Sequence, residues 1–110
     1  MLNKEEILKK RKIFSESDKS MAAAFKVLSD VNRYRIFRIL AEQPKLSVSS
    51  IAKILNISLP LASQHLKILV HANLLCKERS GKKVFTKLEY ENPFVQAVVK
   101  VIQQALESKN

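Results

Sequence analysis

The chain has 110 residues and a formal net charge of +10 at neutral pH, with 46% hydrophobic and 27% charged residues. This length and balance predict one globular domain of ordinary size. The single cysteine excludes an intramolecular disulfide framework, no apolar run is long enough to cross a bilayer, and the N-terminus lacks the apolar core of a secretion signal. We therefore expect a cytoplasmic protein with no membrane partner.

Two helices are predicted at the N-terminus, over residues 2–15 and 17–29. The first pairs Glu with Lys at i,i+4 spacing. Three roles remain open for it: an arm lying across a partner subunit, a solvated and frayed terminus, or a basic membrane anchor, against which Glu5 and Glu6 argue. The second is apolar on nearly all sides and is expected to be buried, partly against another subunit.

A third helix is predicted over residues 31–42, with Asp30 as its N-cap and Pro44 marking its exit. Its inner face is apolar. Arg33, Arg35 and Arg38 lie outside that face. Two interpretations stay open: one arginine contacts a phosphate, or all three are solvated with their aliphatic stems on the core.

Residues 47–75 predict two helices joined by a tight turn. Ser47 and Ser58 are suitable N-caps, and Asn56 suits the left-handed conformation that ends a helix. Over residues 58–70 an inward stripe is formed by Ala62, Leu66 and Leu69, and the opposite face carries Pro60, Ser63, Gln64 and Lys67. This pattern is typical of a helix-turn-helix with a polar, cationic outer face, although an ordinary helical hairpin would share it.

Residues 74–87 predict a β-hairpin. Two short runs flank Ser80 and Gly81, the only glycine of the chain, and residues 84–86 are good strand formers. The hairpin carries or adjoins five cations, which are Lys77, Arg79, Lys82, Lys83 and Lys87. A helix-turn-helix followed directly by a basic hairpin is a winged helix.

Four motifs now occur in order: D-V-N-R-Y-R-I-F at 30–37, L-S-V-S-S-I-A at 46–52, S-Q-H-L-K-I-L at 63–69 and R-S-G-K-K-V-F at 79–85. Together they resemble the ArsR/SmtB family of bacterial and archaeal transcriptional repressors, from roughly residue 22 onward, and the third motif is the most specific. The resemblance implies a homodimeric winged-helix repressor, often released from DNA by a metal ion or a thiol oxidant.

A last helix is predicted after Asn92 as N-cap and Pro93 in its first turn. Its apolar face is wider than one small core needs, and a monomer would expose a large apolar patch. By analogy with the family it pairs with its symmetry mate; burial within its own subunit is the alternative. The predicted dimer interface comprises Met21, Phe25, Phe94, Val95, Val98, Val101, Ile102 and Ala105.

The expected fold is mainly α, a winged helix-turn-helix of about five helices and a two-stranded wing. One domain spans residues 1–110, with dimerisation helices at 1–30 and 92–108 and a DNA-binding core and wing at 31–87. That core holds eleven Lys and Arg against two Glu, or +9, whereas residues 88–110 carry −1. Such segregation favours a polyanion-binding head over a generically basic protein.

The DNA contacts follow if the second helix of the motif enters the major groove. Gln64 can bond adenine, and Pro60 and Leu61 can meet a thymine methyl group. The remaining predicted contacts are to base edges or phosphates, from Ser58, Ser63, His65, Lys67, Arg79, Lys82 and Lys83. His65 matches the motif histidine of the family that the chain resembles, so a structural role stays open for it as well.

The expected function is that of a homodimeric, sequence-specific transcriptional repressor on double-stranded DNA with an inverted-repeat operator. The alternatives are a winged-helix module that binds RNA or a protein partner, and a non-specific architectural DNA binder. No constellation of catalytic residues favours an enzyme.

No metal site of the family's known kinds is predicted, and no other cofactor. Ser47 and Ser49 stand where such family members carry a Cys-x-Cys pair, and hydroxyls do not replace thiolates. The last helix has no Asp or His at 94–106, and His65 and His71 are six residues apart. Cys76 is expected to be a small strand residue; modification that moves the wing is the alternative.

Overall fold

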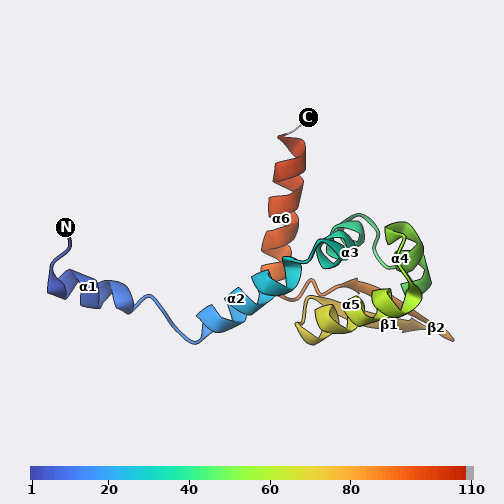
Figure 1. Cartoon of the computed structure of the whole chain (residues 1–110), viewed down its shortest axis with the longest axis horizontal. Coiled ribbons are helices and arrows are strands. Elements are labelled where there is room, and N and C mark those ends of the chain that lie inside the picture. Colours follow the sequence, from blue (N-terminus) through green and yellow to red (C-terminus); the bar gives the residue numbers. More distant parts are fainter. Residues whose placement is uncertain (109–110) are drawn as a thin grey trace.

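The computed structural model describes residues 1–108 and contains six helices among them, where the sequence predicted about five, and one two-stranded antiparallel hairpin. Figure 1 shows the elements in chain order. The helices and strands are α1 (Lys4–Arg11), α2 (Ser17–Leu28), α3 (Val31–Glu42), α4 (Val48–Leu55), α5 (Leu59–His71), β1 (Leu75–Ser80), β2 (Lys83–Leu88) and α6 (Pro93–Glu107). None of these helices combines the length and the apolar character that a bilayer-crossing helix needs.

The helix-turn-helix forms through the predicted caps. Ser47 Oγ accepts a hydrogen bond from Ser50 N at 3.2 Å, and Ser58 Oγ accepts one from Leu61 N at 3.2 Å. Asn56 ends α4 in the left-handed conformation, with φ of 56°. The side chains of Ser47 and Ser58 each satisfy an N–H that the first helical turn leaves free. The local sequence therefore sets the angle at which α5 leaves α4.

One core joins the body of the molecule, defined here as α3 to β2 together with α6 as far as Ile102. It is formed by fully or almost fully buried apolar side chains, namely Ile36, Phe37, Leu40, Ile51, Leu66, Leu69, Leu74, Leu75, Leu88, Val95, Val99 and Ile102. Burying each large side chain contributes roughly 1.5–3 kcal/mol. This core fixes α5 and the hairpin relative to each other.

The hairpin has a third, short partner that the sequence did not predict. β1 and β2 pair in register from Leu75 with Leu88 to Ser80 with Lys83, and Gly81 turns the chain with φ of 61°. In addition, Leu46 N donates to Thr86 O at 3.0 Å and Thr86 N donates to Leu46 O at 2.7 Å. The loop before α4 is thereby bonded to the wing.

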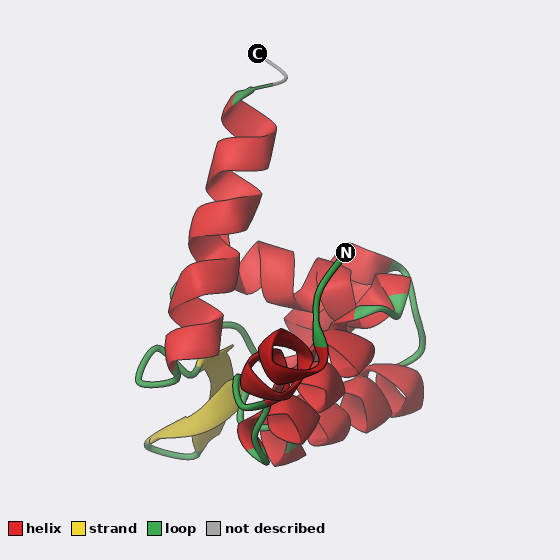
Figure 2. Cartoon of the chain, turned by 90° about the vertical axis from the view of Figure 1, so that its left-hand side faces the viewer, coloured by secondary structure: helices red, strands yellow, loops and turns green. Residues whose placement is uncertain are grey.

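The N-terminal helices lie outside the body. α1 and α2 extend away from it in Figure 1, and α6 stands out from it above the hairpin in Figure 2. α1 begins with a capping box between Asn3 and Glu6, but neither α1 nor α2 has a buried residue. The expected burial of residues 17–29 is therefore met only in part within one chain: Ala24, Val27 and Leu28 are half-buried against the core, whereas Met21 and Phe25 are exposed.

Candidate nucleic-acid interface

The outer face of α5 carries most of the residues that the sequence proposed for base contact. Ser58, Pro60, Ser63, Gln64 and Lys67 are exposed, and Leu61 is half-buried. Ala62, Leu66 and Leu69 turn inward and hold the helix on the core. Sequence reasoning passed over Leu59, which is 49% exposed beside Pro60. α5 thus presents polar, cationic and small apolar groups together on one open face.

His65 lies on the inner side of α5, which favours the structural one of the two roles that the sequence left open for it. It is 8% exposed, and its Nδ1 lies 3.4 Å from Arg33 Nη1 on α3. The imidazole therefore packs against the body instead of facing a base or phosphate. Its spacing, three residues after Ala62 and four before Leu69, already places it on the inward stripe.

The wing tip carries cations that are free of ion pairs within the described part of the chain. Arg79, Lys82 and Lys83 surround the Gly81 turn and are all exposed. The three ion pairs found for residues 1–108 involve none of them, nor Lys67. Two strands joined by a tight turn hold these charges at one end of the molecule. They remain available to an anionic partner.

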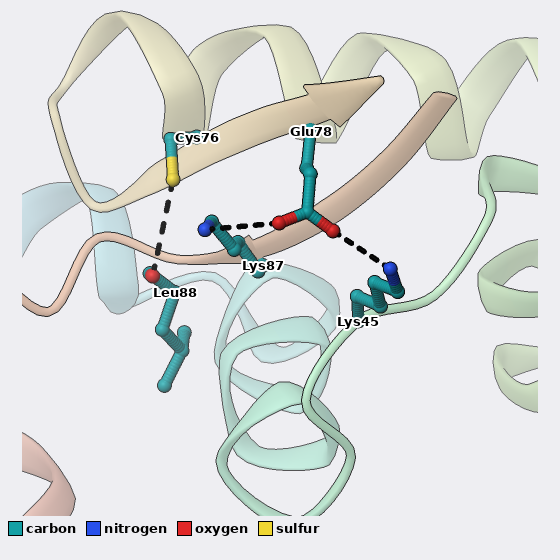
Figure 3. Close-up of polar contacts among 5 residues, drawn as sticks. All are labelled: Lys45, Cys76, Glu78, Lys87 and Leu88. Atoms are coloured by element: carbon teal, nitrogen blue, oxygen red, sulfur yellow. Dashed lines mark hydrogen bonds and ion pairs between the residues drawn. The ribbon is translucent and has the colours of Figure 1, made fainter. Parts of the chain in front are cut away.

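The base of the wing is different, because one carboxylate holds two lysines there (Figure 3). Glu78 accepts hydrogen bonds from Lys45 Nζ at 2.8 Å and from Lys87 Nζ at 3.3 Å. These bonds lower the pKa of the Glu78 carboxyl. Lys45 also lies 4.9 Å from the centre of the Phe85 ring. Lys45 and Lys87 thus brace the wing, while the cations at its tip stay unpaired.

A second, apolar surface lies between α2 and α6. The rings of Phe25 and Phe94 meet edge to face, with centroids 5.0 Å apart. Met21, Phe25 and Val101 are 50%, 60% and 62% exposed. These side chains border a hollow of about 510 Å³, whose lining is formed by Met21, Phe25, Leu28, Tyr34, Pro93, Phe94, Ala97, Val98, Val101 and Ile102. We call it the α2–α6 face.

The burial of two predicted interface residues corrects their assignment. Val95 is fully buried and Ile102 is 8% exposed, so both belong mainly to the core of their own chain. Phe94 and Val98 are half-buried, and Ala105 is exposed. α6 uses one flank for its own core and leaves the other open. Spacing alone did not divide its broad apolar face into these two flanks.

No group of three or more His, Cys, Asp or Glu suited to a metal ion occurs among residues 1–108. Cys76 is half-buried, and its thiol approaches Leu88 O at 3.9 Å (Figure 3). Burial, followed by the negative charge of Glu89, raises the pKa of this thiol. A protonated thiol is a poor nucleophile.

Comparison with known proteins gives consistent results. A family model for bacterial regulatory proteins of the arsR family matches residues 30–77. The cadmium resistance transcriptional regulatory protein CadC homolog of Staphylococcus aureus is 30% identical over 83 residues, which cover 76% of this chain and 69% of that protein. The chain spans 64% of the length of each of three further relatives.

Solved structures share the architecture. The transcriptional repressor PagR of Bacillus anthracis has a TM-score of 0.69 and 26% identity, over 78% of this chain and 95% of that chain. The homodimeric winged helix-turn-helix DNA-binding domain of Mb0332 from Mycobacterium bovis has a TM-score of 0.68 and 24% identity, over 81% and 80%. These similarities confirm the predicted winged helix-turn-helix.

Proposed function

The chain belongs to the arsR family of bacterial regulatory proteins, and from this premise we propose that it is a homodimeric, sequence-specific DNA-binding repressor of transcription. The observation that carries the proposal is the pairing of two features on one rigid body. α5 exposes a polar reading face, and the adjoining wing exposes unpaired cations. Together they match the groove-and-backbone contacts of winged-helix proteins.

The residues divide into two roles. Gln64 and Ser63 are proposed to contact base edges, and Pro60 and Leu61 to contact thymine methyl groups. Lys67, Arg79, Lys82 and Lys83 are proposed to bind phosphates, with Ser58 at the start of α5 nearby. The +9 charge of residues 31–87 supports this division, because phosphate contacts supply the sequence-independent part of the affinity.

Homodimerisation is proposed to occur through the α2–α6 face. Its exposed Phe25 and Val101, continuous with the hollow beside Phe94, form an apolar surface of the kind that mediates protein association. Twofold symmetry would pair this face with its own copy and present two α5 helices to one inverted repeat. The homodimeric state of the Mb0332 domain supports this assembly.

Repression is proposed to result from occupation of the operator; PagR, whose structure is similar, is a transcriptional repressor. The proposal includes no enzymatic activity and no metal cofactor, since hydroxyls at Ser47 and Ser49 are weak ligands for soft metals. A DNA-bound regulator of this kind acts in the cytoplasm.

A footprint of the purified protein on its own upstream DNA, at two salt concentrations, tests the proposal. Protection of an inverted repeat is expected, with half-sites about 10 bp or a multiple apart. Binding should weaken steeply as salt rises. Uniform, salt-sensitive coating without a repeat would contradict operator binding and favour an architectural or RNA-binding role.

A further inference from the structure

We propose that Arg33 is a positioning residue that holds the recognition helix α5 through neutral His65, and that protonation of His65 releases this hold and weakens sequence-specific binding. The inference deepens the proposed function and rests on it. We call the pair the Arg33–His65 contact.

Arg33 connects three helices. It lies in the first turn of α3, where its backbone N donates to Asp30 Oδ1 at 3.0 Å. Its Nε donates to Val27 O in the last turn of α2 at 2.7 Å, and its Nη1 reaches His65 Nδ1 on α5 at 3.4 Å. One planar guanidinium therefore joins a helix of the α2–α6 face to the helix proposed to read DNA.

The chemistry of the two groups determines which form of His65 a hydrogen bond at this contact needs. A guanidinium donates hydrogen bonds and accepts none. The Nδ1 atom must therefore accept, which requires a neutral imidazole with its proton on Nε2. A protonated imidazole donates from both nitrogens and would place a second positive charge against Arg33. Protonation thus converts an attractive contact into a repulsive one.

The Asp30 carboxylate lies close enough to interact electrostatically with Arg33 and His65. The pKa of Asp30 is lowered, first by the hydrogen bond from the Arg33 backbone, with burial opposing, and by the charges of Arg33 and of His65 in its protonated form. Asp30 is the N-cap of α3, so its position is fixed by the helix that carries Arg33.

The charged groups of the other elements packed against α5 form no hydrogen bond or ion pair with His65 among the described residues. α4 and β1 are the remaining elements in close contact with it. Their charged residues are Lys53, Lys77 and Arg79, which are exposed, and Glu78, which is bonded to Lys45 and Lys87. The Arg33–His65 contact is therefore the polar link between α5 and α3 that a proton can break.

The expected effect falls on specific binding. Gln64 directly precedes His65, so a small shift of α5 misplaces its side chain relative to a base edge. Phosphate contacts tolerate such shifts better, because a flexible lysine can follow them. The ratio of operator affinity to non-specific affinity is therefore the quantity that reports this contact, and it cancels the general electrostatic gain from an added positive charge.

Nitrogen NMR of the DNA-free protein provides the first test. The expected spectrum of His65 is that of the neutral tautomer with its proton on Nε2, and Arg33→Lys should shift it toward a tautomer mixture. A single ammonium cannot keep the planar fork that spans Val27 and His65. A dominant Nδ1–H tautomer would overturn the proposal, whatever the DNA results.

The second test measures the affinity ratio between about pH 8 and pH 5.5, the range in which histidine ordinarily titrates. The wild-type ratio is expected to fall about five- to ten-fold, the size of one hydrogen bond. His65→Asn places an amide oxygen where Nδ1 lies and does not titrate, so its ratio should stay constant. His71→Asn changes the exposed histidine of the same helix and should follow the wild type.

Two results would overturn the proposal. In the first, the affinity ratio of His65→Asn decreases between pH 8 and pH 5.5 as much as that of the wild type. In the second, the wild-type ratio does not change over this range. Absence of any sequence preference at pH 8 would instead contradict the proposed function, while the NMR tautomer still decides whether the contact exists. Circular dichroism of each variant separates these outcomes from a failure to fold.

Discussion

The body of the molecule and its terminal helices differ in how completely a single chain buries their apolar side chains. The body buries twelve apolar residues in one core and satisfies its helix ends with its own side chains. α1 and α2 contribute no buried residue, and α6 leaves one flank open. The body is therefore a structure that one chain completes, whereas one chain leaves the terminal helices incompletely buried.

The sharpest test of this comparison replaces one phenylalanine from each region. Phe37→Ala should lower the free energy of unfolding by about 3–5 kcal/mol, because Phe37 is fully buried. Phe25→Ala, in protein dilute enough to be monomeric, should cost about 1 kcal/mol or less, mainly the edge-to-face contact with Phe94. Urea unfolding measures both. Equal losses would show that α2 belongs to the core after all.

Val101→Asp tests whether the open flank of α6 joins two copies. A charge on this 62% exposed residue should convert the dimer to a folded monomer. Operator affinity should then fall about a hundred-fold or more, because two linked half-site contacts become one. Sedimentation and fluorescence anisotropy measure the two effects. Ile54→Asp, at a 52% exposed residue on α4, is the control and should leave the dimer intact.

Gln64→Ala tests the reading face of the body. Removal of a bidentate base contact should reduce discrimination at one base pair by about 1–3 kcal/mol, with non-specific affinity nearly unchanged. Competition against operators altered at single positions measures this change. A loss of non-specific affinity alone would mean that α5 does not read the sequence.

Asp30→Ala tests the boundary between the two regions, where α2 meets α3. Removing this N-cap should cost about 1 kcal/mol at neutral pH. Because folding lowers the pKa of Asp30, its contribution is complete above the ordinary value of 3.8 and is lost as pH falls through the lowered value. Wild type and variant should therefore converge in acid, as urea unfolding at several pH values would measure. A constant difference would contradict the role of the ionised carboxylate.

Lys82→Ala has the smallest expected effect. It should weaken binding to all sequences by a similar, few-fold factor. The slope of log affinity against log salt should become shallower by about one, because one phosphate is no longer neutralised. Salt titrations on operator and random DNA measure this change. Lys100→Ala, at an exposed residue of α6, is the control and should leave the slope unchanged.

The sequence predicted well what depends on near neighbours in the chain. The caps Ser47 and Ser58, the left-handed Asn56 and the turn at Gly81 each occur as expected, because each is fixed by a few adjacent residues. The order of these elements was enough to indicate the winged helix-turn-helix. The assignment of individual residues to DNA contact remains a prediction.

What the sequence missed depends on distant partners. A DNA-side and a structural role were both open for His65, and its contact with Arg33, 32 residues earlier, was not predicted. Val95 was assigned to the dimer, but the core of its own chain covers it. The two bonds of Glu78 join lysines 33 residues before it and 9 residues after it. Helical periodicity indicates that one face of a helix is apolar, but it does not indicate which element or subunit packs against that face.

The short pairing of Leu46 with Thr86 also limits how the chain can change in length. The segment before α4 is tied to the wing at Leu46 and to the helix at Ser47, so an insertion between Leu46 and Ser47 would break one of these attachments. The turn at Gly81 has no such second attachment, and nothing lies within 4 Å of the position of an added Cβ there. Natural or engineered variants of this protein should therefore tolerate longer wing tips far more readily than extra residues between Leu46 and the start of α4.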